Sequence, residues 1–263
     1  MDRLLLVIST FCFMFGFGYT MHAIGARTYR RNRLNLVMLL IGFLFQTAFL
    51  YVRGQAVGRC PLTNTFEVIT FFCWSMVLFY LLIGPAYRLS LLGVFTSPLV
   101  FLLQVGALLM PPTPVVRAKA PLSAWLELHA AVSVVAYGAF ALACVAGVMY
   151  LAQERQLKTH QFRSIFYHLP PIHDLAVANS RLILTGFLLF TLGLFAGVMH
   201  GPAHLHVLRI VSVVLWVVYG LILVATFWHR ISPRKVALLS VGTFGVMLLT
   251  LWSVQLLPKE AAL

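Results

Sequence analysis

Long apolar segments separated by short polar connections dominate the sequence. Eight segments hold enough consecutive apolar residues to cross a bilayer as helices. They are Leu4–Ile24, Leu34–Tyr51, Phe66–Ile83, Leu89–Met110, Leu128–Leu151, Ala178–Met199, Val207–Trp228 and Val236–Leu257. Only helices suit such spans, because lipid offers the backbone no hydrogen bonds. The pattern predicts an all-α integral membrane protein with one polytopic domain over residues 1–263.

The composition agrees with lipid as the main solvent. Hydrophobic residues make up 61% of the 263 residues and charged residues only 10%, which is too little polar surface for a soluble protein. The net charge of +13 would suggest nucleic acid in a soluble protein, but these cations stand in short runs between apolar segments. We interpret them as topology signals and expect the bilayer, and no nucleic acid, as a partner.

The Lys and Arg residues also predict an orientation. With eight spans, 12 of the 19 cations fall on one side, including the four arginines of the connection "RTYRRNR", and 7 fall on the other. The richer side is expected to face the cytoplasm. This places both termini outside the cytoplasm (N-out/C-out) and puts His129, which opens the fifth span, at the outer surface.

Several classes of function are excluded by what the spans lack. All six acidic residues stand at span ends or in connections, which argues against an ion-driven pump and against hydrolysis by paired buried carboxylates. The four cysteines form no CxxC motif, so neither a dithiol redox site nor a zinc knuckle is supported. Since no nucleophile–base or acid–base pair is apparent, we expect the protein not to be an enzyme.

The predicted inner side holds five of the nine histidines (His22, His160, His168, His173 and His229), and the outer side holds the other four. His129 stands there, and the connection "MHGPAHLHVLR" between the sixth and seventh spans holds His200, His204 and His206. Neutral imidazole is a common ligand of metals and of haem iron. Two plainer interpretations stay open: His129 is an interfacial residue beside Glu127, or the three other histidines form a solvated loop. A divalent metal is a weaker alternative, because the loop holds no carboxylate.

A haem site would also need aromatic walls and cations for the propionates. Candidate wall residues are Trp125, Tyr137, Trp216 and Tyr219, and candidate cations are Arg53, Arg59, Arg117, Lys119 and Arg209. Elsewhere, Asn64 or a neighbouring threonine is expected to cap the third helix, with Glu67 in its first turn. The "GLFAG" pattern at Gly193 and Gly197 predicts close helix packing without chemistry, and Gly138 is expected to help pack the fifth helix on the sixth.

The longest inner connection runs over residues 152–177. Its apolar positions, Leu157, Phe162, Ile165, Phe166 and Leu169, fall roughly on one helical face and favour a short interfacial helix. A plain basic loop is the alternative. In either form, this connection could contact a protein partner or anionic lipid.

Three stretches carry a resemblance to a known family. They are "PLTNTFEVITFFCW" (61–74), "PLSAWLELHAAVSVVAYGAFALACVAGVMYLAQERQLK" (121–158) and "LPPIHDLAVANSRLILTGFLLFTLGLFAGV" (169–198). They resemble the cytochrome c assembly membrane proteins, which handle haem at the outer face of the bacterial cytoplasmic membrane. The resemblance is strongest over residues 60–220. It implies an eight-helix fold and location in that membrane, and it assigns His129 the place of a haem-ligand histidine.

The sequence also departs from the family pattern. The outer loop "HGPAHLHVLR" lacks the family's tryptophan-rich signature, Val224 stands about where a further histidine is expected, and no histidine follows the last span. The chain therefore resembles the divergent, HemX-like branch. We predict a membrane protein that binds or senses haem or a related tetrapyrrole at the outer face. The alternative is a cofactor-free regulatory or scaffolding subunit with the same fold.

Overall fold

The computed structural model describes residues 2–25, 33–84, 90–111, 123–159, 171–200, 206–228 and 231–256. In these residues the chain forms eight α-helices and no strand. They are α1 (Asp2–Gly25), α2 (Arg33–Val57), α3 (Thr65–Ile83), α4 (Ser90–Leu109), α5 (Ala124–Thr159), α6 (Ile172–His200), α7 (His206–Phe227) and α8 (Pro233–Leu256). Each predicted span coincides with one of these helices to within a residue or lies inside it, so the all-α prediction is confirmed.

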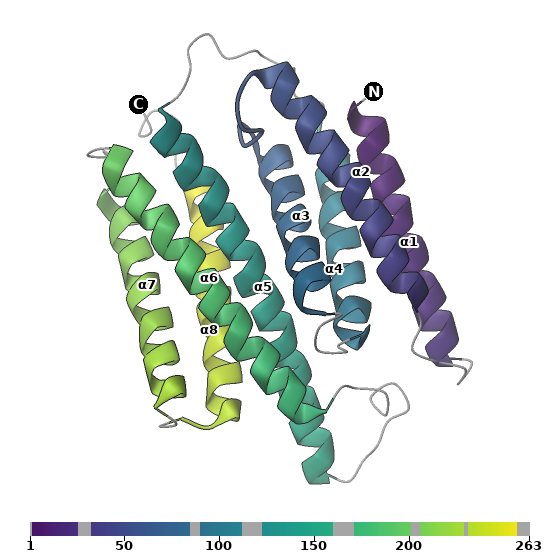
Figure 1. The fold of residues 1–263 in the computed structure, drawn as a ribbon, viewed down its shortest axis with the longest axis vertical. Coiled ribbons are helices and arrows are strands. Elements are labelled where there is room, and N and C mark those ends of the chain that lie inside the picture. Colours follow the sequence, from purple (N-terminus) through teal and green to yellow (C-terminus); the bar gives the residue numbers. More distant parts are fainter. Residues whose placement is uncertain are drawn as a thin grey trace.

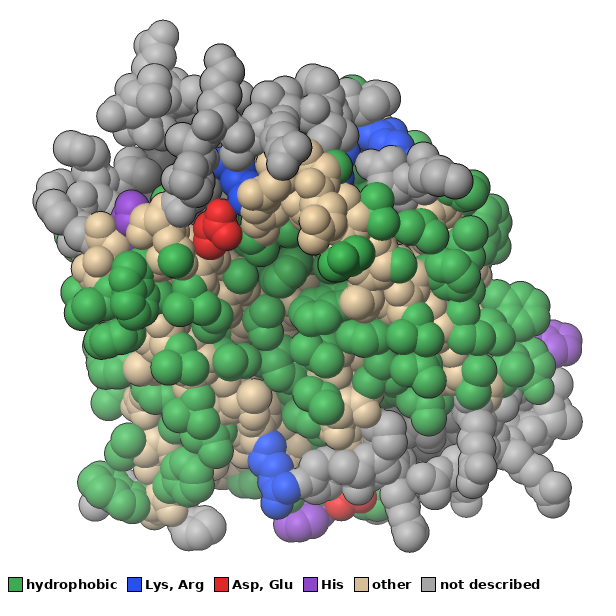
Figure 2. All heavy atoms as spheres, turned by 45° about the horizontal axis from the view of Figure 1, so that its top comes forward, with side chains coloured by type: hydrophobic (Ala, Val, Ile, Leu, Met, Phe, Trp, Pro, Cys, Tyr) green, Lys and Arg blue, Asp and Glu red, His purple; other side chains and the backbone are tan. Residues whose placement is uncertain are grey.

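The outer faces of the helices are apolar. Six helices, α2 to α7, contain segments long and apolar enough to cross a membrane. Large exposed hydrophobic side chains occur on all eight helices, among them Phe11, Leu44, Leu82 and Leu249. Figure 2 shows such side chains spread over the middle of one face, with charged side chains near its two ends. Such a surface requires lipid around it, and the protein is a multi-pass membrane protein.

Helix α5 connects two halves of the bundle. Helices α1 to α4 pack together, and α5 packs against α3 on one side and against α6 and α8 on the other (Figure 1). We call the end that holds the start of α5 and the end of α6 the outer end, and the opposite end the inner end. The start of α1 and the end of α8 both lie at the outer end (Figure 1). Which end faces the cytoplasm stays a prediction.

Small residues let α5 approach its neighbours closely. A Cβ atom on Gly138 would lie 2.5 Å from the Cβ of Ser75, so Gly138 faces α3. The expectation that Gly138 packs against α6 is therefore wrong, because the register of α5 turns this position toward the other half of the bundle. On the α6 side, a Cβ on Gly193 would lie 2.8 Å from the hydroxyl of Ser133. This contact confirms the predicted close packing of α5 and α6.

A polar junction joins α5, α6 and α8 toward the inner end. The side-chain nitrogen of Asn179 donates to the carbonyl oxygen of Ala143 at 3.2 Å and to the hydroxyl of Ser240 at 3.1 Å. Ser240 in turn donates to the carbonyl of Ala237 at 3.0 Å. The junction fits beside Gly147, where a Cβ would lie 2.8 Å from the Asn179 nitrogen. In lipid such bonds between helices stabilise the packing, because the same groups would otherwise lack partners.

Helix α5 continues past its predicted end. It has 36 residues and extends to Thr159 rather than Leu151, and α6 already begins at Ile172. The predicted bounds of the inner connection, residues 152–177, are therefore wrong at both ends. At 1.5 Å per residue α5 is about 54 Å long, well beyond the ~30 Å of a hydrocarbon core. Glu154 supports the extension through Lys158 at 2.7 Å and Arg234 at 3.4 Å. Most of the proposed interfacial helix, residues 160–170, lies outside the described residues.

Candidate functional site

His129 lies in the second turn of α5, half-buried against α6. Its Nδ1 is 2.7 Å from the carbonyl oxygen of Gly193. A Cβ on Gly197 would lie 2.9 Å from the same Nδ1, so the ring occupies space that a larger residue on α6 would fill. The two glycines of "GLFAG" therefore do more than bring two helices together. They hold an imidazole, and we call His129, Gly193 and Gly197 the His129 site.

The hydrogen bond determines which nitrogen of His129 carries the proton. A carbonyl oxygen can only accept, so Nδ1 must be the donor toward Gly193. In the neutral ring the lone pair is then on Nε2, the nitrogen that a metal or haem iron would bind. Histidine ligands commonly donate their other ring N–H to a backbone carbonyl in this way, which fixes the ring orientation and raises the basicity of the ligating nitrogen.

Two further predicted site residues lie on α5 and contact α6. Trp125, one turn before His129, has its ring 6.3 Å from that of Phe195 in an edge-to-face arrangement. The indole is 43% exposed, as expected for a residue at a membrane surface. Tyr137, two turns beyond His129, has its ring 5.9 Å from that of Phe190. The structure thus places aromatic side chains on both sides of His129 along the α5–α6 contact.

The other predicted histidines are only partly described. His200 is exposed at the end of α6, and its spacing of three and seven residues from Gly197 and Gly193 puts it on the same helix face. His206 begins α7, but its side chain is outside the description, and His204 lies outside the described residues. A histidine opposite His129 therefore stays a prediction. Among the side chains that the structure describes, no group of three His, Cys, Asp or Glu could hold a metal ion.

Two other candidate wall residues, Trp216 and Tyr219, lie on α7. Tyr219 stacks on Phe140, with ring centroids 3.9 Å apart. Phe140 is eleven residues beyond His129 on α5, about 16 Å further along the helix. Trp216 bonds Thr191 at 2.8 Å and stacks on Phe187. Both residues pack within the second half of the bundle, and Tyr219 is deep in its core. Their part as haem walls stays a prediction.

Arg53 has a different role from the one predicted for it. Its Nε lies 2.7 Å from Oε1 of Glu67, with side-chain exposures of 6% and 0%. A buried charge needs such a partner, so Arg53 is held by Glu67 rather than directed toward a ligand. Arg59, in the connection between α2 and α3, is different: its Nε is buried and has no hydrogen-bond partner in the described part of the chain.

The remaining bonds of Glu67 order the connection between α2 and α3. Its Oε2 accepts from the backbone nitrogen of Thr63 at 2.8 Å and from the Thr63 hydroxyl at 2.7 Å. Asn64 accepts from the Glu67 backbone nitrogen at 2.9 Å, which confirms the predicted cap. Sequence reasoning found the cap but missed the ion pair, since only the packing of α2 on α3 brings Arg53 to Glu67.

This connection also lies close to the start of α5. Burial, followed by the negative charges of Glu127 and Glu67, raises the pKa of the Cys60 thiol. The charge of Glu127, in the first turn of α5, is thus within electrostatic reach of the Cys60 segment. The ordered connection between α2 and α3 therefore lies at the outer end, on the Glu127 side of α5, which is a different helix face from that of His129.

Together, these features define a polytopic helical membrane protein with a histidine held between two helices at one membrane surface. Comparison of the chain with known proteins identifies the family to which it belongs. The family described as Cytochrome C assembly protein matches residues 62–261, and the protein belongs to it.

Individual relatives agree with this assignment. The chain is 28% identical over 171 residues to Protein HemX of Brevibacillus brevis, covering 65% of this chain and 63% of that protein. It is 32% identical over 111 residues to Cytochrome c biogenesis protein CcsA of Chlorella vulgaris, covering 40% and 35%. It is 24% identical over 221 residues to Protein HemX of Bacillus subtilis (strain 168), covering 81% and 80%. The chain thus spans less than two thirds of the length of the first two relatives.

Proposed function

We propose that the protein handles haem in the cytoplasmic membrane of a bacterium and binds it at the outer end of the bundle, with His129 as an axial ligand of the iron. One observation carries the proposal: the bond from Nδ1 to the Gly193 carbonyl, which leaves Nε2 as the free ligand atom. Membership of the cytochrome c assembly family supports haem, rather than another metal group, as the cofactor.

The surroundings of His129 fit this group. Trp125 and Phe195 offer an aromatic surface beside the imidazole. Arg59 carries an unused buried donor in the connection that lies near the start of α5, and a carboxylate of the porphyrin is a suitable acceptor for it. Haem would supply the iron chemistry. The chain supplies an oriented imidazole, apolar contact and a cation.

The test is the absorption spectrum of the purified protein titrated with haemin. The His129→Ala variant is expected to lose or shift the haem band, while His22→Ala, which removes an exposed histidine near the inner end of α1, leaves it unchanged. One axial imidazole gives a high-spin, exchangeable haem, and a second histidine gives a low-spin spectrum. A wild-type protein that takes up no haem under oxidising or reducing conditions would contradict the proposal.

The second candidate function is a cofactor-free regulatory or scaffolding subunit. The extension of α5 favours it, because this helix carries the exposed cations Arg155 and Lys158 beyond the predicted membrane span. A soluble protein or anionic lipid at the inner surface would bind there. Replacing Lys158 and Arg163 by Gln should weaken that binding by about 1 kcal/mol per charge and leave a haem spectrum unchanged. Unchanged partner and lipid binding in this variant would argue against the second function.

A further inference from the structure

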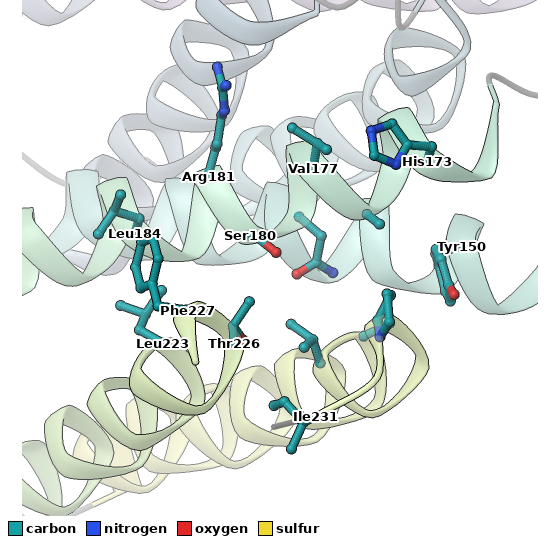
Figure 3. A pocket seen from close by; sticks show the side chains of 15 residues that line it. Tyr150, His173, Val177, Ser180, Arg181, Leu184, Leu223, Thr226, Phe227 and Ile231 are labelled. Atoms are coloured by element: carbon teal, nitrogen blue, oxygen red, sulfur yellow. The ribbon is translucent and has the colours of Figure 1, made fainter. Parts of the chain in front are cut away.

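A cavity of about 430 Å³ lies between α6, α7 and α8 at the inner end of the bundle. Its walls are mostly apolar and include Val177, Leu184, Leu223, Phe227 and Val236 (Figure 3). We call it the inner cavity. Its volume falls within the range of about 300–1,000 Å³ typical of ligand pockets in proteins. It is separate from the His129 site, which lies at the opposite end.

The inner cavity is elongated along α6. Leu184 and Phe227 lie at one end and Tyr150 at the other, with Ser180 between them (Figure 3). The lining residues of α6 run from His173 to Leu184, about 16 Å at 1.5 Å per residue. The shape therefore suits a narrow chain that enters from the inner surface and reaches toward the middle of the bilayer.

Polar side chains also line the inner cavity, among them His173, Asn179, Ser180 and Arg181, and some of them bond the protein itself. The hydroxyl of Thr226 donates to the carbonyl of Ile222 at 2.6 Å. The side-chain nitrogen of Asn179 donates to Ala143 and Ser240. The Oδ1 of Asn179 is buried without a partner in the described part of the chain. Most of the wall is nevertheless apolar, and each water molecule filling the cavity would need two to four polar partners. An apolar occupant is favoured, and in a bilayer the acyl chains of lipids are the abundant apolar ligand.

Cations surround the mouth of the inner cavity. Arg234 and Lys235 follow Pro233, which lines it, and both are exposed. Arg155 and Lys158 lie nearby at the end of α5, where a second hollow is lined by Arg155, Lys158 and Arg234 together. The described acids at this end are Glu154, which already contacts Lys158 and Arg234, and Asp174 in the first turn of α6. The mouth is therefore net positive and attracts an anionic headgroup.

We propose that the inner cavity holds one acyl chain of an anionic phospholipid, whose phosphate lies beside Arg234 and Lys235 at the start of α8. The lipid fills the space between α7 and the rest of the bundle and links α6, α7 and α8 at the inner surface. The proposal does not depend on haem binding. It predicts a lipid that stays with the protein when the bulk lipid is removed, with an anionic headgroup preferred over a zwitterionic one.

The first test measures bound lipid by native mass spectrometry. The protein is reconstituted in nanodiscs of equal parts phosphatidylcholine and phosphatidylglycerol with identical acyl chains, then transferred to detergent. One phosphatidylglycerol is expected to remain. The Leu223→Trp variant fills the cavity and should lower its retention at least tenfold, while Leu248→Trp, at an exposed position of α8 outside the cavity, should not change it. Thermal unfolding in detergent verifies that both variants are folded.

The second test separates local recognition from general attraction by the basic inner end. Arg234→Gln/Lys235→Gln and Arg155→Gln/Lys158→Gln each remove two exposed cations and one partner of Glu154. The first pair should reduce phosphatidylglycerol retention by about fivefold per charge, and the second by much less. Three results would each overturn the proposal. The two double variants could lose phosphatidylglycerol equally, or the wild type could retain the two lipids equally. The third is displacement of the lipid by haemin in a one-to-one ratio.

Discussion

Gly197→Ala tests the His129 site without touching the histidine. The added Cβ would lie 2.9 Å from His129 Nδ1, closer than real Cβ atoms approach other groups, and 3.2 Å from Cε1, which is tighter than most Cβ contacts. The imidazole must therefore move away from α6. Its hydrogen bond to the Gly193 carbonyl, 2.7 Å long, then lengthens or breaks.

Two effects on stability nearly cancel in this variant. The lost hydrogen bond costs about 0.5–1.5 kcal/mol. Replacing a helical glycine by alanine returns about 1 kcal/mol through helix propensity. The free energy of unfolding should therefore change by less than ~1 kcal/mol. Haem affinity should fall about 10–100-fold, because the hydrogen bond to the Gly193 carbonyl that orients the ligating imidazole is gone.

The assay is a haemin titration followed by absorption, together with thermal unfolding in detergent. Gly242→Ala on α8 is the matched control, since a Cβ there meets nothing within 4 Å. It should gain slight stability and bind haem as the wild type does. The reasoning is refuted if Gly197→Ala binds haem with wild-type affinity, or if both alanine variants lose affinity equally.

Three other predictions concern the outer end and the topology. Glu67→Gln leaves Arg53 without its anionic partner and should destabilise the fold by about 3–5 kcal/mol, with part of the loss recovered when Arg53 is also replaced by Met; thermal unfolding measures both. Because burial and two nearby carboxylates raise the pKa of Cys60, the thiol of Cys60 should react with a maleimide at pH 7 more slowly in the folded protein than in the unfolded chain, and the reaction should accelerate as the pH rises. A reporter fused after Leu263 should behave as exported and one inserted within Lys158–His168 as cytoplasmic, and reversed signals would contradict the N-out/C-out orientation.

The helices could be predicted from the sequence because each depends on a local property. A run of apolar residues in lipid must satisfy its own backbone hydrogen bonds, and this alone predicts a helix wherever such a run occurs. The cap at Asn64 was predictable for the same reason, since its bond reaches only three residues along the chain. The end of α5 was not, because Glu154 holds the polar extension through Arg234 of α8 as well as through Lys158.

The candidate site was only partly predictable because it depends on contacts between helices. His129 and the "GLFAG" pattern could both be seen in the sequence. The contact of the imidazole with those two glycines could not, since the sequence does not give the register of α5 on α6. Arg53 presented the same difficulty: its charge suggested a ligand for propionates, yet Glu67, fourteen positions along the chain, takes it as a partner. Tyr219 stacks on Phe140 in the core, a depth that follows from packing and that the sequence does not give.

Helix α5 also carries a mechanical consequence. It runs without a proline from the imidazole at one membrane surface to the cations beyond the other, and neighbouring helices hold it along its middle. A stiff rod restrained in this way moves as one body. A tilt of the helix imposed at its outer end would therefore reappear at its inner end and act on the contacts of Glu154 with Lys158 and Arg234, without a chain of intermediate side chains to transmit it.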